Sequence, residues 1–171
     1  MTVVAVKKQN GIVSIASDDA TTSGYTTISN ADNKSFTKLK QIGKYTIAGS
    51  GLTSITSLLF MYAKTHLIRE NSEEGVLDWF KGFLDWRKEK TGEYGISSNN
   101  FIIVWDNKIY EFQDFQVTEI RENYAIGSGR DFALAAMYMG ASAKKAVECA
   151  INFDSYCSAP VHFFNCIGGK T

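Results

Sequence analysis

Two short apolar runs on either side of Asn10-Gly11 open the chain. Asn-Gly between apolar runs is the strongest short-range signal for a β-hairpin, because both residues accept the positive φ of a tight turn. The sequence therefore predicts two antiparallel strands, residues 3–8 and 12–17. Polar and small residues then dominate 18–34 and predict short strands and turns.

Apolar residues next recur at helical spacing in two separate pairs of segments. Short apolar runs bounded by turn residues predict further strands between and after these pairs. The predicted helices are residues 52–67, a helix capped near Ser72 that ends before Gly92, residues 132–139, and a helix that starts after Ser142 and reaches Asp154. The predicted strands are residues 36–42, 45–48, 101–105, 108–112, 117–120, 124–126 and 160–167.

This order of elements predicts the architecture. Strands, a helix pair, strands, a second helix pair and a closing strand fit stacked layers better than alternating βαβ units. Two antiparallel sheets packed face to face, with a helix pair on each outer side, would bury every apolar stripe. We expect an α+β protein with a four-layer αββα sandwich, built as a single domain over residues 1–171.

Charge and composition exclude several classes of function. The chain carries 18 basic and 18 acidic side chains, so its formal net charge is zero. Binding to nucleic acid or to a membrane surface through bulk charge is therefore not expected. The odd set of cysteines, Cys149, Cys157 and Cys166, indicates reduced thiols. Without a secretory signal or a membrane-spanning run, we expect a cytoplasmic protein that starts directly at its first strand.

The sequence motifs do not support metal or cofactor chemistry. The only histidines are His66 and His162, and neither histidines nor cysteines have the spacing of metal ligands. The two Gly-Ser-Gly segments, 49–51 and 127–129, lack the lysine of a phosphate-binding loop and are typical of turns between a strand and a helix. We expect no metal and no cofactor.

Other residues suggest a nucleophile at the start of the chain. Removal of Met1 would place the hydroxyl of Thr2 beside a free α-amine, and these two groups form a known nucleophile-and-base pair. Further marks follow in order along the chain. They are Thr2 to Lys8, Ile15-Ala16-Ser17-Asp18, Lys34 with Leu39 after it, Ile47-Ala48-Gly49, Ala125 to Gly129 with an alanine-rich helix, and Asp154-Ser155-Tyr156.

These marks make the chain similar to the proteasome β-subunit and HslV-type peptidase family of N-terminal-nucleophile hydrolases. The resemblance spans almost the whole chain and implies a threonine-type endopeptidase that is inactive while Met1 is retained. Its length looks more like the HslV type than a eukaryotic proteasome subunit.

The resemblance also implies a role for each site residue. Thr2 would attack the peptide carbonyl. Lys34, held by Asp18, would lower the pKa of the amine and stabilise negative charge. The N–H of Gly49 would be the oxyanion donor. Ser128 and Asp154 would form the supporting hydrogen-bond shell.

The same resemblance implies partners. We expect polypeptide substrates, homo-oligomeric rings that enclose the site, and a ring ATPase that unfolds substrates.

Two other functions remain open with the same fold. One is an inactive ring-forming scaffold, which would follow if Met1 occupied the nucleophile position with one residue inserted at Gln9-Asn10. The other is an N-terminal-nucleophile amidase that acts on a small molecule. Within the family pattern, Asp19 replaces a glycine, and Cys157 replaces the serine common in proteasome subunits.

Overall fold

The computed structural model describes residues 2–23, 26–28, 36–96 and 98–166. Its strands and helices follow the predicted order closely. In chain order they are β1 (Val3–Gln9), β2 (Ile12–Ser17), β3 (Thr21–Ser23), β4 (Thr26–Ile28), β5 (Leu39–Ile42), β6 (Tyr45–Ser50), α1 (Thr53–Ala63), α2 (Glu73–Thr91), β7 (Asn100–Trp105), β8 (Lys108–Gln113), β9 (Gln116–Ile120), β10 (Asn123–Gly127), α3 (Arg130–Tyr138), α4 (Ala143–Phe153) and β11 (His162–Cys166).

Two antiparallel sheets form the centre of the molecule. One has four strands in the order β10-β1-β2-β11, and the other has five in the order β5-β6-β7-β8-β9. Strands β1 and β2 pair without interruption up to Gln9 opposite Ile12, and Asn10 and Gly11 both have positive φ. The first hairpin therefore has the tight two-residue turn that the Asn-Gly dipeptide predicts.

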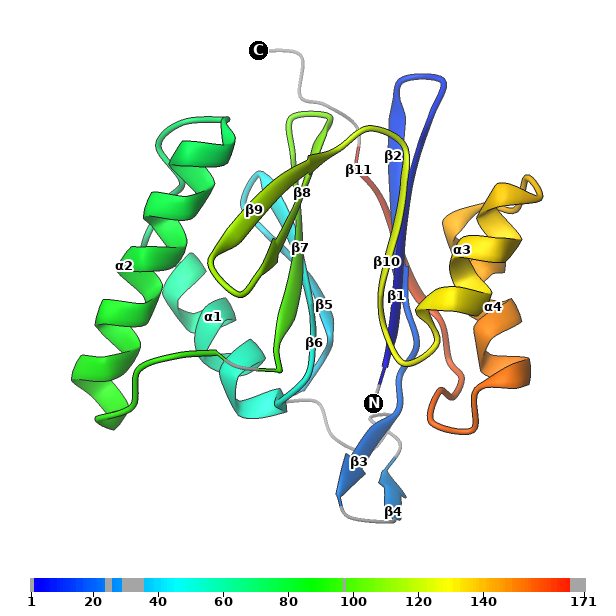
Figure 1. The fold of residues 1–171 in the computed structure, drawn as a ribbon, viewed down its shortest axis with the longest axis horizontal. Helices are drawn as coiled ribbons and strands as arrows, with labels where there is room; N and C mark the ends of the chain where they lie inside the picture. The colour runs from blue at the N-terminus through cyan, green and yellow to red at the C-terminus, as the bar shows by residue number, and fades with distance from the viewer. Residues whose placement is uncertain (1, 24–25, 29–35, 97, 167–171) are drawn as a thin grey trace.

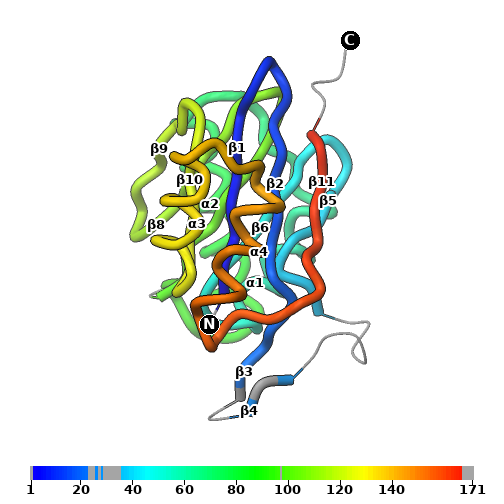
Figure 2. Tube along the Cα trace, turned by 90° about the vertical axis from the view of Figure 1, so that its right-hand side faces the viewer, coloured from blue at the N-terminus to red at the C-terminus, as the bar shows by residue number. Residues whose placement is uncertain are grey.

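Four layers stack in the order helices, sheet, sheet, helices (Figure 1). Helices α1 and α2 cover the five-stranded sheet, while α3 and α4 cover the four-stranded sheet, with α3 over β10 and β1 and α4 over β1 and β2 (Figure 2). A third apolar cluster fills the space between the sheets, with Val4, Ile15 and Ile102 among its fully buried members. The predicted αββα sandwich is confirmed.

Helix α1 is shorter than predicted. The apolar spacing suggested a helix to residue 67, but α1 ends at Ala63 and His66 lies in the following loop. The carbonyl of Tyr62 there accepts hydrogen bonds from the backbone N–H groups of Thr65 and His66. The His66 ring also stacks on the Tyr62 ring at 4.0 Å. These contacts satisfy the Tyr62 carbonyl, one of the last in the helix, from residues of the loop that follows it.

Smaller differences concern the ends of other elements. Strand β5 begins at Leu39 rather than at residue 36, and α3 begins at Arg130, ahead of its first apolar residue. Helix α4 ends at Phe153, so Asp154 is its C-cap rather than a helical residue. The N-cap of α2 is Ser72, as predicted, and its hydroxyl accepts from Gly75 N–H at 3.1 Å. No helix within the described residues is long and apolar enough to cross a membrane.

Candidate active site

A cleft of ≈ 490 Å³ lies at the end of the sandwich where β1 begins. Both sheets contribute to its walls, with Gly127 from β10 on one side and Ser50 from β6 on the other. Three of the residues that the sequence singled out, Thr2, Gly49 and Ser128, line this cleft. The fold therefore brings together residues that are up to 126 positions apart in the chain.

Thr2 is anchored by the turn that follows β10. Its backbone N–H donates to Ser128 Oγ at 3.3 Å, and its carbonyl oxygen accepts from Gly129 N–H at 3.3 Å. Only glycine suits position 127, because φ is +95° there and a Cβ would collide with the Thr2 carbonyl. Thr2 is 4% exposed. The β1–β10 pairing, which begins with Val3 opposite Gly127, fixes its position at the cleft.

Asp18 is fully buried beside Thr2 and is surrounded by donors. Its Oδ1 accepts from Val3 N–H at 2.9 Å and from Lys38 Nζ at 2.8 Å. Its Oδ2 accepts from Ala20 N–H at 3.0 Å and from Ser158 N–H at 3.3 Å. A buried carboxylate is stable only when its oxygens are satisfied in this way. Asp18 therefore ties the start of β1 to the ammonium group at the cleft.

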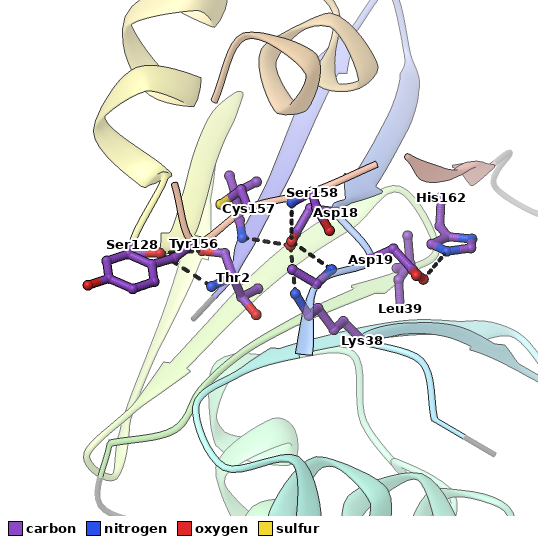
Figure 3. Close-up of polar contacts among 12 residues, drawn as sticks. Thr2, Asp18, Asp19, Lys38, Leu39, Ser128, Tyr156, Cys157, Ser158 and His162 are labelled. Atoms are coloured by element: carbon purple, nitrogen blue, oxygen red, sulfur yellow. Dashed lines mark hydrogen bonds and ion pairs between the residues drawn. The ribbon is translucent and has the colours of Figure 1, made fainter. Parts of the chain in front are cut away.

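The ammonium group that pairs with Asp18 belongs to Lys38. Lys34, which the sequence singled out, lies outside the described residues, so its place in the structure is not described. Lys38 lines the cleft, and its side chain is only 3% exposed. Figure 3 shows Lys38 reaching Asp18 close to Thr2. The structure thus supplies, at Lys38, the buried ion pair that was expected at Lys34.

The position of Lys38 is set by the β5–β6 hairpin. Ile42 pairs with Tyr45 across the turn, and counting back along the hairpin brings position 38 opposite Gly49. The strands predicted at residues 36–42 and 45–48 leave Gly43-Lys44 as the turn between them. An antiparallel register about that turn fixes which residues face each other, so the facing of positions 38 and 49 was implicit in the sequence. The interpretation from spacing along the chain missed it.

Burial and neighbouring charges act in opposite directions on Lys38. Burial disfavours the ammonium form and lowers its pKa, while the charge and hydrogen bond of Asp18 raise it. The net result is a pKa below the ordinary value for lysine. Lys38 therefore loses its proton at a lower pH than an exposed lysine does.

Asp154 belongs to a second polar group, which reaches Thr2 through Ser128. Its Oδ1 accepts from Tyr156 N–H at 2.9 Å, and its Oδ2 accepts from the thiol of Cys157 at 3.3 Å. Burial raises the pKa of Asp154, but the bonds from Tyr156, the Ser128 hydroxyl and Cys157 lower it, and the net pKa is below the ordinary value. Asp154 thus holds Ser128, which in turn contacts Thr2.

Gly49 lies at the cleft, but its N–H group already has an acceptor. It donates to the Lys38 carbonyl oxygen at 2.9 Å as part of the β5–β6 pair. A Cβ at position 49 would lie 2.7 Å from Thr56 Oγ1 and 2.9 Å from the Phe101 ring, so a side chain does not fit there. Its role as an oxyanion donor stays a prediction, and the structure gives its N–H a competing partner.

Comparison with known proteins adds information on the fold. No protein-family model and no curated protein sequence matches the chain. Among solved structures, BPH from Thiobacillus denitrificans in complex with epoxomicin is similar with a TM-score of 0.87 and 23% identity, covering 98% of this chain and 100% of that one. HslV from Trypanosoma brucei has a TM-score of 0.75 at 19% identity, covering 96% of this chain and 98% of that one.

A third similar structure is Anbu, an ancestral β-subunit, from Yersinia bercovieri. Its TM-score is 0.72 at 12% identity, and the match covers 96% of this chain and 81% of that one. The chain has the same αββα fold as these proteins. At these identities the likeness establishes the fold alone.

Within this fold, two polar groups flank Thr2, and Figure 3 shows Ser128 on one side of it and the Asp18–Lys38 pair on the other. One is formed by Asp18 and Lys38, and the other by Ser128 and Asp154. Thr2, Lys38 and Ser128 line the same cleft, and a buried cation there can stabilise negative charge that develops near Thr2.

Proposed function

We propose that the chain is a threonine-type endopeptidase whose nucleophile is Thr2 after removal of Met1. The observation that carries the proposal is the position of Thr2, which lines the cleft together with Lys38 and donates its N–H to Ser128. Loss of Met1 would turn that N–H into an α-amine beside the Thr2 hydroxyl. An α-amine has an ordinary pKa of about 7.7–8.0, so it serves as a base near neutral pH.

The reaction follows from these groups. The α-amine takes the proton from Thr2 Oγ as this oxygen attacks the peptide carbonyl carbon, and the carbonyl oxygen becomes an oxyanion. The protonated amine then gives its proton to the leaving nitrogen, and the carbon–nitrogen bond breaks to leave an ester on Thr2. Water, deprotonated by the same amine, hydrolyses the ester and restores Thr2.

Supporting residues adjust the charge and the orientation of these groups. Lys38, rather than Lys34, supplies the positive charge that lowers the pKa of the amine and favours negative charge in the cleft. Asp18 holds Lys38 at 2.8 Å. Ser128 and Asp154 orient the amine through the bond now made by the Thr2 N–H. Gly49 N–H acts as an oxyanion donor when the substrate carbonyl replaces the Lys38 carbonyl as its acceptor.

A matched pair of proteins tests the mechanism. One retains Met1, and the other begins at Thr2 because it is released from a cleavable fusion. We expect only the second to cleave fluorogenic peptides. Thr2→Ala should reduce cleavage by at least about 10³-fold, whereas Thr2→Ser keeps a hydroxyl and retains activity. Equal cleavage by the two chains, or by Thr2→Ala, would refute the mechanism.

Binding of epoxomicin gives a second readout of the cleft. BPH from T. denitrificans was solved in complex with this compound. We expect epoxomicin to bind the chain that begins at Thr2 and to block peptide cleavage, and Thr2→Ala to abolish both effects. Absence of binding to an active chain would argue for a cleft of different specificity, such as that of an amidase for small molecules.

We also propose that homo-oligomeric rings enclose the cleft and that a ring ATPase delivers unfolded polypeptides to it. Large apolar side chains on the outer helical layer, Tyr138, Met139 and Phe153, are exposed in the single chain and are available for contacts between copies. The three free thiols favour a cytoplasmic location. Light scattering tests the assembly, since a monomer would exclude the ring. Rings without peptide cleavage by the chain that begins at Thr2 would favour the inactive scaffold.

A further inference from the structure

A second carboxylate, that of Asp19, lies buried next to Asp18. Asp19 is 4% exposed, and its backbone N–H donates to the Ser158 carbonyl at 3.0 Å. Its Oδ1 lies 2.6 Å from Nε2 of His162, at the start of β11 (Figure 3). Both the backbone and the side chain of Asp19 are therefore held in place. A carboxylate removed from water needs such partners and strong local interactions to remain charged.

Asp19 is connected to the candidate site through shared contacts. Ser158 joins the two acids, because its N–H donates to Asp18 and its carbonyl accepts from Asp19. Asp19 also acts on Lys38 through space. Burial is the largest effect on the pKa of Lys38 and lowers it, while Asp18, Cys157 and Asp19 each raise it. The negative field at the ammonium thus comes from two adjacent carboxylates, and Asp18 also accepts a direct bond from it at 2.8 Å.

We propose that Asp19, held by His162, is a positioning residue that keeps Lys38 charged during the reaction at Thr2. The proposal rests on the proposed peptidase function. Asp18 already accepts from three backbone N–H groups, and these donors partly neutralise its negative charge. Asp19 supplies additional negative charge near Lys38 without competing for those donors. His162 orients that charge through the contact of its Nε2 with Asp19 Oδ1 at 2.6 Å.

Replacing Asp19 by asparagine tests this role, because Asn keeps the shape but removes the charge. We expect the alkaline limb of the kcat profile to move to lower pH in Asp19→Asn, since Lys38 then loses its proton more readily. KM should change little, because Asp19 is absent from the residues that line the cleft. His162→Gln keeps an uncharged donor and should leave the alkaline limb in place. Glu89→Gln, on the exposed surface of α2, is the control for net charge.

A direct titration of Lys38 separates this proposal from the proposed function. The side-chain NMR signal of Lys38, assigned with Lys38→Arg, should titrate at lower pH in Asp19→Asn than in the wild type, whether or not the protein cleaves peptides. An unchanged titration overturns the role of Asp19, and an inactive wild type with the expected shift overturns the peptidase function only.

If Asp19→Asn does not fold, as circular dichroism would show, His162→Lys replaces it. This variant places a permanent cation beside Asp19 and should lower the pKa of Lys38 in the same direction. An unchanged Lys38 titration in folded His162→Lys also overturns the proposal.

Discussion

Asp18 Oδ1 and Lys38 Nζ lie 2.8 Å apart, with both side chains almost entirely removed from solvent. A buried pair of this kind is costly to break, because removing one partner leaves the other as an uncompensated charge. Both residues also contact elements that define the cleft, since Asp18 binds Val3 N–H and the Lys38 carbonyl accepts from Gly49 N–H. The ion pair therefore joins the two sheets at the candidate site.

Lysine substitutions distinguish Lys38 from Lys34. We expect Lys38→Ala to lower the free energy of unfolding by about 3–5 kcal/mol, because Asp18 stays buried without its cation. Peptide cleavage by the folded fraction should fall by about 10²-fold or more, the usual loss when one charge-stabilising group is removed. Lys34→Ala is the matched control, in which we expect peptide cleavage to be retained because Asp18 keeps its cation at Lys38. Urea unfolding and fluorogenic peptides measure the two effects, and a loss of activity in Lys34→Ala alone would reverse the assignment.

Most of the fold was readable from local patterns. The Asn10-Gly11 turn, the Ser72 and Ser142 caps and the helical periodicities are local signals, and the structure contains each of them. The end of α1 was not readable, because the contact between Tyr62 and His66 competes with an apolar spacing that continues to Leu67.

The candidate site was only partly predictable, for a different physical reason. The family resemblance, rather than any local pattern, implied that Ser128 supports Thr2, and the structure places Ser128 Oγ 3.3 Å from the Thr2 backbone nitrogen. Which lysine reaches Asp18 depends on how long the polar connection between Asp18 and β5 is. The composition of such a connection does not indicate the length that the fold requires. The pairing of Asp19 with His162 depends on where β11 lies beside β2, which is a contact between distant segments.

Glycine substitutions test the close approach of β10 to Thr2. Gly127→Ala should be severely destabilising, by about 3 kcal/mol or more, because the new Cβ collides with the Thr2 carbonyl as well as adopting a positive φ. Gly140→Ala is the control, since its φ is +99° but a Cβ there meets no atom within 4 Å. Gly140→Ala should lose only about 1–2 kcal/mol of stability, the cost of holding an alanine at a positive φ. Equal losses in thermal unfolding would show that the contact with Thr2 is unimportant.

Serine substitutions test the orientation of the amine. Ser128→Ala removes the acceptor of the Thr2 N–H, and we expect kcat to fall by about 10²-fold with little change in KM. Ser142→Ala is a matched change at the N-cap of α4, away from the cleft. It should cost about 1 kcal/mol of stability and leave kcat unchanged. Comparable kcat values for the two variants would remove Ser128 from the mechanism.

Cys157 makes the stability of the protein depend on alkaline pH. Burial raises the pKa of its thiol to about 12, and the charge of Asp18 and the hydrogen bond to Asp154 act in the same direction. The thiol of an unfolded chain ionises near pH 8.5, at about its ordinary pKa. Above that pH the folded state holds a proton at Cys157 that the unfolded state has lost, so its contribution to stability is present below about pH 8.5 and is lost as pH rises toward 12.

Removing the thiol should therefore flatten the alkaline decline in stability. Cys157→Ser keeps a donor for Asp154 but has no ionisable group in this range, so its free energy of unfolding should fall less steeply than that of the wild type as pH rises above about 8.5. Cys157→Ala should share the flatter slope but be less stable at neutral pH, because Asp154 loses a donor. Urea unfolding from neutral to alkaline pH measures both the slope and the stability at neutral pH. A wild-type slope in Cys157→Ser would mean that another group releases the proton, and Tyr124, whose pKa burial raises to about 12, would then be the next to substitute.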